Sequence, residues 1–209
     1  EVMFSIEDPF ALDNTQMKRI LNNKINTKNY QKVIESFKRD GAKSTFLSDV
    51  LARIQEGLSL TKGESIRQIA SSMMLSADNG HALHPNHTDK ADPTNAPHLN
   101  GGVLIKYNAN QKYTTDGIAE ALFKKLLQKE EIPYQEYTNR SDIAGGSTLG
   151  NLSNEKISLN TVDMGAAQLA MHSAYETGGT KDTLSLVDGI RIFYESRIQM
   201  EEDGRYRCY

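Results

Sequence analysis

One aspartate and three histidines lie within ten residues of the stretch "MLSADNGHALHPNHTDK", which covers residues 74–90. His81, His84 and His87 recur at every third position shortly after Asp78. Carboxylate and imidazole groups are common ligands of divalent metal ions, so this stretch is a candidate metal site. The alternative is a polar loop whose side chains only form hydrogen bonds.

The two parts of this cluster lie in different local contexts. Proline lacks a backbone N–H and clashes with the preceding turn, so Pro85 prevents His84 and His87 from sharing one helix face. Asp78 instead follows directly on the apolar run of residues 71–77, at the carboxyl end of a predicted strand. Proteins with alternating helices and strands place their chemistry at such ends, where a divalent cation can balance a carboxylate.

The elements that must position these groups alternate between helix and strand. Apolar spacing predicts a helix over residues 46–57, with Ser44 or Thr45 as its N-cap and Gly57 at its end. Further helices are predicted over 61–70, 117–130 and 183–198, and strands over 71–77, 102–109, 132–139 and 157–165. This order predicts an α/β fold in which helices cover a central sheet.

Two segments carry no clear periodicity. Residues 79–102 contain three prolines and are predicted to form a long loop, which in compact domains is either functional or disordered. Residues 14–40 are polar, and two short helices or a mobile segment both fit them. We therefore divide the chain into a poorly defined N-terminal segment, residues 1–40, and a domain over residues 41–209.

The composition excludes several classes of protein. With 38% hydrophobic and 24% charged residues, the chain has the composition of a globular protein with one substantial core. A formal charge of −3 argues against a broad nucleic-acid interface. No apolar run of about 18 residues spans a membrane, and no signal peptide opens the chain. The single cysteine, Cys208, forms no internal disulfide, so we expect a cytoplasmic protein.

Five stretches of the chain resemble one known family. They are "LSADNGHALHPNHTDK", "GGVLIKYNANQKYTTDG", "RSDIAGGSTLG", "TVDMGAAQLAMHS" and "GGTKD". Together, and in this order, they resemble the aspartyl aminopeptidase family of zinc metallopeptidases, particularly its bacterial members, from about Gly41 to about Ser196. The resemblance implies a three-layer α/β/α sandwich of the zinc-peptidase type, of which residues 41–209 are the C-terminal part, and a homo-oligomer.

The resemblance also implies an activity and its residues. Such enzymes release N-terminal residues from peptides with two zinc ions, which hold a bridging water and polarise the peptide carbonyl, while a glutamate takes the proton. Asp78 and His172 correspond to zinc ligands, and His81 to a group that contacts substrate and stabilises the oxyanion. Lys106 and Tyr113 correspond to substrate contacts, the lysine favouring an acidic side chain by its charge. Without the resemblance, these residues fit a packed histidine, a solvated lysine and a core aromatic.

The glycine-rich segment "RSDIAGGSTLG" has a local interpretation of its own. Its paired glycines permit a tight turn, and Ser147 or Thr148 is a candidate cap for a following helix. The resemblance places this loop near the active site, with Arg140 and Asp142 bracing it as an ion pair. A purely structural turn is the alternative.

Three further residues near the motifs receive weaker assignments. His84 and His87 have no specific role in the resemblance and are interpreted as loop structure. Glu176 lies four residues after His172 and is a candidate partner of that histidine if the segment is helical.

The first forty residues depart from the family's pattern. An early "SHxDSP"-like motif is absent, and only "ALDN" echoes the motif of the bridging aspartate, which makes Asp13 a candidate metal ligand. The family's catalytic glutamate pair falls on Lys32 and Val33, which serve neither as base nor as ligand, and Glu35 is out of register. Two explanations fit: a fragment of a longer enzyme, or a degenerate relative that acts in binding or assembly. The ligand types suit zinc, and also manganese or cobalt.

Overall fold

The main sheet has four strands in the order β1–β5–β3–β4 in the computed structural model, which describes residues 44–201 and 203–209. The strands are β1 (Met73–Ala77), β5 (Asn160–Gly165), β3 (Val103–Tyr107) and β4 (Tyr134–Thr138). β1 runs parallel to β5 and β3 runs parallel to β4, whereas β3 and β5 are antiparallel. All four predicted strands are confirmed, and the sheet is mixed.

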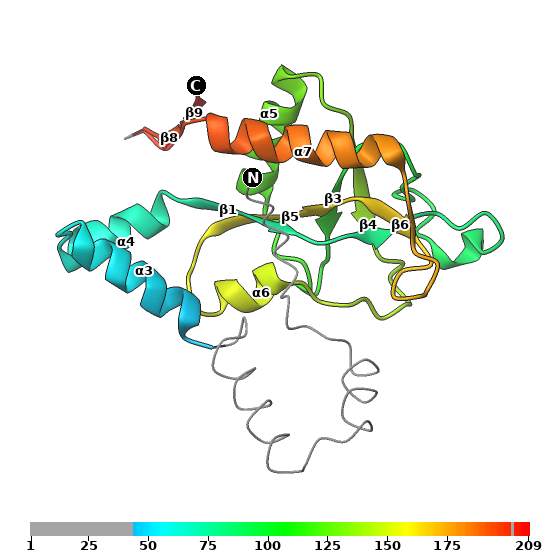
Figure 1. Cartoon of the computed structure of the whole chain (residues 1–209), viewed down its shortest axis with the longest axis horizontal. Coiled ribbons are helices and arrows are strands. Elements are labelled where there is room, and N and C mark those ends of the chain that lie inside the picture. Colours follow the sequence, from blue (N-terminus) through cyan, green and yellow to red (C-terminus); the bar gives the residue numbers. More distant parts are fainter. Residues whose placement is uncertain (1–43, 202) are drawn as a thin grey trace, which may run out of the picture.

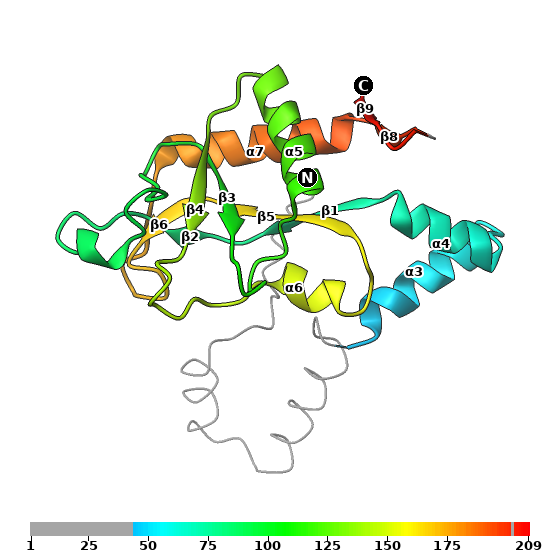
Figure 2. The ribbon, with the colours of Figure 1, turned by 180° about the vertical axis from the view of Figure 1, so that it is seen from behind.

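Helices cover both faces of this sheet (Figure 1). α5 (Gly117–Lys129) and α7 (Thr180–Glu195) lie on one face, and the short α6 (Leu149–Asn154) lies on the other, as the reverse view also shows (Figure 2). The main core fills the space between the sheet and the α5–α7 layer, and its buried residues are Val103, Ile105, Ala119, Phe123, Leu126, Leu127, Ile132, Val162, Met164 and Ile192. The α/β fold with helices on a central sheet is therefore confirmed.

Local sequence explains where the two long helices begin. Asp116 caps α5, because its Oδ1 accepts hydrogen bonds from the backbone N–H groups of Ile118 and Ala119. The apolar residues of α5 recur at helical spacing and are buried against the sheet. α7 begins at Thr180, three residues before the predicted start, and ends at Glu195. The predicted end was too late, because Ile198 belongs to β8 (Ile198–Met200), which pairs with β9 (Tyr206–Cys208).

Two helices lie beyond the amino end of β1 (Figure 1). α3 (Phe46–Gly57) ends at Gly57 as predicted, and Thr45 takes the N-cap position without a capping hydrogen bond from its side chain. α4 (Lys62–Ala70) begins with a capping box, in which Thr61 and Glu64 each accept a hydrogen bond from the other's backbone N–H. Within the described part of the chain, α3 buries none of its residues.

A second, smaller sheet stands beside the main one. It consists of β2 (Gly80–His81), β6 (Ala167–Leu169) and β7 (Thr177–Gly178), in that order. β2 and the 3-10 turn η1 (Thr88–Lys90) are the only regular elements that the structure describes in the predicted loop 79–102. The segment 14–40 and Asp13 lie outside the described residues. In the described ranges, none of the helices is both long and apolar enough to cross a membrane.

Candidate active site

The main sheet has one apolar face and one polar face. Val103 and Ile105 of β3 and Val162 and Met164 of β5 belong to the core under α5 and α7. Side chains alternate between the two faces of a strand, so Lys106, which follows Ile105, lies on the opposite face, toward α6. Asp163 and Thr161 of β5, Ser76 of β1 and Asp78, which directly follows β1, lie on this same face, and the carboxylates of Asp78 and Asp163 act on Lys106. The polar face is therefore the place where chemistry-bearing residues of three strands meet.

Lys106 is the most unusual residue of this face. Its side chain is fully buried, and its Nζ lies 3.7 Å from Asp78 Oδ2 and 4.9 Å from the centroid of the Tyr113 ring. Among residues 44–201 and 203–209, no group accepts a hydrogen bond from this ammonium. Burial lowers the pKa of Lys106, while the carboxylates of Asp78 and Asp163 oppose that shift. The interpretation of Lys106 as a solvated lysine is wrong, because the strand places it beneath the surface.

Asp163 belongs to the site although the sequence did not point to it. Its side chain is fully buried on β5, where Oδ2 accepts a hydrogen bond from the backbone N–H of Thr114. Its own backbone N–H donates to Thr115 Oγ1 at 2.9 Å, and its Oδ1 has no partner. Asp163 therefore holds the loop after β3 against the sheet and places a negative charge near Lys106. An acidic residue inside the apolar strand "TVDMG" was the available signal.

Tyr113 is held by that same loop. Its ring is buried in a small cluster with Leu104 and Tyr137, with 6.2 Å between the two tyrosine ring centroids. Burial raises the pKa of the Tyr113 hydroxyl. Tyr113 is therefore a core aromatic, as its interpretation without the resemblance has it, and its ring also lies beside the Lys106 ammonium.

The small sheet carries the two histidines. His81 is an exposed residue of β2, and β2 pairs with β6, which leads into the turn that holds His172. Although the residue as a whole is exposed, partial desolvation of its ring, and then the charge of the neighbouring His172, lower the pKa of His81. Residues 91 positions apart are thus brought into electrostatic contact, whereas the sequence related them only through the family resemblance.

The segment around His172 is a turn and not a helix. His172 has a backbone φ of +66°, in the left-handed region that non-glycine residues seldom occupy. Its backbone N–H donates a hydrogen bond to Glu176 Oε1. Glu176 is therefore a partner of His172, but the helical geometry proposed for the pair is wrong, and the contact is to the backbone and not to the imidazole.

The described residues supply part of a metal site. Asp78 is half-buried directly after β1, and its carboxylate lies beside the Lys106 ammonium. His172 lies in the turn after β6, where its charge acts on the His81 imidazole. Over residues 44–201 and 203–209, no three or more His, Cys, Asp or Glu side chains gather closely enough to hold an ion. The donor types suit zinc, but the set is incomplete in this part of the chain.

The neighbouring loops match their structural interpretation. Arg140 and Asp142 form the predicted ion pair, with Arg140 Nε 2.6 Å from Asp142 Oδ1, and Arg140 also donates to the backbone carbonyl of Asp89. The imidazole rings of His84 and His87 lie 5.0 Å apart. His84 Nδ1 accepts a hydrogen bond from the backbone N–H of Asn86, as expected of loop residues.

The predicted cap of the helix after the glycine-rich loop is only half right. Thr148 takes the N-cap position of α6, but its side chain forms no capping hydrogen bond, and its buried Oγ1 has no partner. Ser147 Oγ instead accepts a hydrogen bond from the side chain of Asn151.

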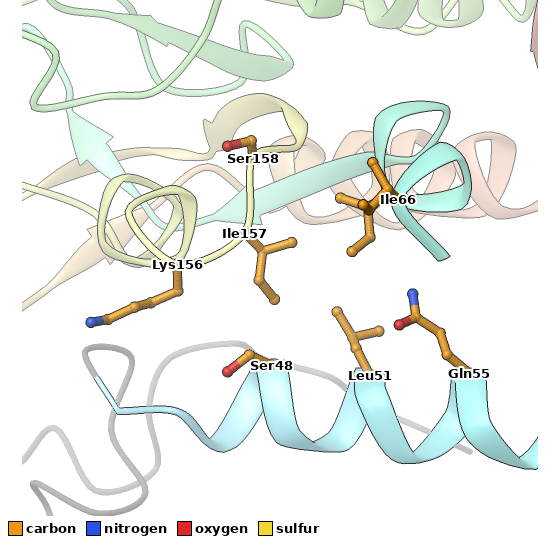
Figure 3. A pocket seen from close by; sticks show the side chains of 8 residues that line it. Ser48, Leu51, Gln55, Ile66, Lys156, Ile157 and Ser158 are labelled. Atoms are coloured by element: carbon orange, nitrogen blue, oxygen red, sulfur yellow. The ribbon is translucent and has the colours of Figure 1, made fainter. Parts of the chain in front are cut away.

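A hollow of about 300 Å³ lies elsewhere, between α3, α4 and the segment after α6. Figure 3 shows Leu51, Ile66 and Ile157 pointing into it. The hollow lies at the amino end of β1, whereas Asp78 follows the carboxyl end of that strand. None of the residues that line the hollow belongs to the polar face of the main sheet. The hollow is therefore separate from the candidate active site.

Comparison with known proteins identifies relatives. The model of the family described as "Aminopeptidase I zinc metalloprotease (M18)" matches residues 6–194. A probable M18 family aminopeptidase 2 of Clostridium acetobutylicum is 41% identical over 161 residues, which are 77% of this chain and 37% of the relative. The chain therefore spans little more than a third of the length of the curated relatives it matches.

Solved structures agree with this result. One, from a cryo-EM structure of the Ape4 and Nbr1 complex, has 39% identity and a TM-score of 0.72, and the match covers 78% of this chain and 31% of that one. Another, the S. cerevisiae mApe1 dodecamer, has 27% identity and a TM-score of 0.65, with 78% and 36% covered. The described fold is thus an α/β zinc-peptidase fold.

Proposed function

Because the chain belongs to the aminopeptidase I zinc metalloprotease (M18) family, we propose that the protein is a metal-dependent aminopeptidase acting on the N-termini of peptides. The observation that carries the proposal is the buried Lys106 ammonium beside Asp78, which has no hydrogen-bond acceptor in the part of the chain that the structure describes. A buried cation without a partner is costly, so it is retained where something bound to the site completes it.

We propose an acidic residue at the substrate's N-terminus. A carboxylate side chain that reaches Lys106 would supply the missing acceptor through a charge-assisted hydrogen bond in a water-poor pocket. The Tyr113 ring, 4.9 Å from Lys106 Nζ, forms one wall of that pocket and excludes water from it. A neutral side chain would leave the ammonium with its ion pair to Asp78 but without a hydrogen-bond acceptor, and this difference is the source of the expected preference.

The remaining residues would act on the peptide bond. Zinc, when bound, supplies an activated water and polarises the scissile carbonyl, and Asp78 and His172 would be among its ligands. His81 would donate a hydrogen bond to the oxyanion that forms at that carbonyl. The other ligands, with Asp13 as one candidate, and the general base are not assigned to described residues. Manganese or cobalt would suit the same donors.

The test is hydrolysis of Asp-, Glu-, Ala- and Leu-para-nitroanilides by the full chain, with zinc, manganese or cobalt added. We expect the acidic substrates to be preferred, and Lys106→Gln to remove that preference mainly through KM. Lys125→Gln changes an exposed lysine on α5 and is the matched control. Equal rates on Asp and Leu substrates by the parent chain would refute the acidic preference.

A non-catalytic assembly role is the second candidate. It is favoured by the lack of a complete donor set among the described residues, and a relative of known structure is a dodecamer. We propose a homo-oligomer in either case. A chain that forms a defined oligomer by light scattering, yet turns over none of the four substrates with any of the three metals, would support the assembly role and overturn the peptidase.

A further inference from the structure

Asp182, near the start of α7, is a fully buried carboxylate that is engaged by a distant segment. Its Oδ2 accepts a hydrogen bond from the backbone N–H of Asn100 at 2.7 Å, and its Oδ1 accepts one from the backbone N–H of Gly102 at 2.8 Å. The contact is reciprocal, because Asn100 Oδ1 accepts a hydrogen bond from the backbone N–H of Lys181 at 3.0 Å. These three hydrogen bonds form a clasp between α7 and the segment before β3.

The backbone around the clasp is shaped to fit it. Asn100 and Gly102 have φ values of +64° and +95°, both in the left-handed region. Gly179 has no room for a side chain, since a Cβ there would lie 2.3 Å from Asp182 Oδ2 and 2.5 Å from the Asn100 nitrogen. The backbone N–H donors and the amino end of α7 together stabilise the buried charge. This arrangement is more specific than an ordinary helix cap.

The clasp joins the two sheets that carry the site. Gly179 continues directly from β7, the strand that closes the turn holding His172 and belongs to the small sheet of His81. On the other side, Gly102 immediately precedes β3, and Lys106 follows four residues later. The histidines and the lysine are therefore connected through Asp182 as well as through the chain.

The opposite end of the small sheet has a different attachment. Asn79 Oδ1 accepts a hydrogen bond from the backbone N–H of Ala166 at 3.0 Å, and its side-chain amide donates to Gln168. This contact fixes β2 and β6 close to Asp78, but it does not reach β7 or the turn of His172. The hydrogen bonds of the Asp182 clasp instead tie the segment that follows β7 to the residues just before β3.

We propose that Asp182 is a positioning residue, which holds the His172 turn and the small sheet at a fixed distance from Lys106. The roles of His172, His81 and Lys106 rest on the proposed function, whereas the clasp itself is a property of the fold. Its test therefore uses readouts that do not require turnover or metal.

The experiment compares the full chain with its Asp182→Asn variant by hydrogen exchange and by NMR of the histidine imidazoles. Asparagine keeps the shape but turns an N–H₂ group toward one of the two backbone donors, so one hydrogen bond is lost and a donor is left unpaired. We expect exchange in residues 98–102 and 170–179 to accelerate about tenfold or more. The imidazole signals of His81 and His172 should shift, while exchange in β3 and β5 stays unchanged.

Two further variants make the result decisive. Asp188→Asn changes a half-buried carboxylate farther along α7, which accepts a hydrogen bond from Arg191, and should leave all of these signals in place. Asn100→Gly tolerates the φ of +64° and removes only the acceptor of the Lys181 N–H, so it decides the matter if Asp182→Asn unfolds. Faster exchange confined to residues 179–185, with both histidine signals unmoved, would reduce Asp182 to a helix cap and overturn the proposal. Failure of the parent chain to bind metal or cleave peptides would count against the proposed function alone.

Discussion

Replacing Lys106 by methionine tests whether the polar face depends on a buried charge balance. Methionine fills nearly the same volume and has no charge, so it removes the ammonium without opening a large cavity. Asp163 would then stay fully buried with its hydrogen bond from Thr114 but would lose the positive charge of Lys106. Its Oδ1 has no hydrogen-bond partner among the described residues, so no donor would compensate for that loss. Asp78 is partly exposed, so water screens it and its loss of a partner costs little.

The expected loss of stability in Lys106→Met comes mainly from Asp163, because Asp163 is fully buried and Asp78 is partly exposed. Removing one partner of a close buried ion pair costs about 3–5 kcal/mol, and this range is an upper bound here because Lys106 acts on Asp163 through its charge and forms its ion pair with Asp78. Burial is also the main cause that lowers the pKa of Lys106, so the variant is relieved of a desolvation penalty and the lower end of that range applies. For a chain of this size, about 3 kcal/mol lowers Tm by about 6–12 °C.

The assay is thermal and urea unfolding, followed by circular dichroism at pH 7.5, for a double-mutant cycle of Lys106→Met and Asp163→Asn. The double variant removes both charges, so we expect it to be more stable than the sum of the single changes predicts, by about 0.5–3 kcal/mol. Lys125→Met, on the exposed side of α5, is the control and should change stability by less than about 0.5 kcal/mol. A Lys106→Met chain as stable as the parent, or an additive cycle, would refute the charge balance.

Three other predictions test the site's framework. Gly165→Ala places a Cβ 1.9 Å from the backbone carbonyl oxygen of Asp78, so urea unfolding should show a loss of at least about 1–3 kcal/mol, and an unchanged midpoint would contradict this contact. The NMR-titrated pKa of His81 should lie below 6.5 and rise in a His172→Ala variant, which removes a neighbouring charge but not the burial. Because the unfolded chain then binds that proton more tightly, the contribution of His81 to stability is present above pH 6.5 and is lost as pH falls through its lowered pKa. Phe123→Ala empties a fully buried position under α7 and should cost about 3–5 kcal/mol, measured by the same unfolding assays.

The sequence predicted those helices in which the apolar residues repeat over several turns. α5 and α3 appear close to the expected bounds, because each repeats apolar residues over three turns. β2, β6 and β7 were missed, because strands of two or three residues contain no period and exist only through pairing with distant segments. The sequence also could not predict whether the apolar face of α3 is buried, because burial depends on which segments pack against the helix and not on the helix itself.

The site was predictable where a residue type already demanded explanation. Asp78 stood out because it follows an apolar strand, whereas Lys106 and Tyr113 were assigned through the family resemblance alone, and the structure brings the three together. Asp163 and Asp182 were missed, because their partners are backbone N–H groups of segments far away in the sequence. A backbone donor leaves no mark in the sequence, so the acidic residue within the apolar strand "TVDMG" could signal a buried carboxylate but could not identify its partner.

The polar face carries one positive and two negative charges, from Lys106 and from Asp78 and Asp163. On its own this set is net negative and would repel the acidic substrate that Lys106 is proposed to attract. Binding of a divalent cation beside Asp78 would reverse the sign, leaving Asp163 to balance Lys106 and a net positive site facing the substrate. The acidic preference should therefore depend on the metal as much as on the lysine, and a metal-free chain should bind a free aspartate no better than a free leucine. Calorimetry with and without zinc measures this directly, and equal aspartate affinity in both states would show that Lys106 alone sets the preference.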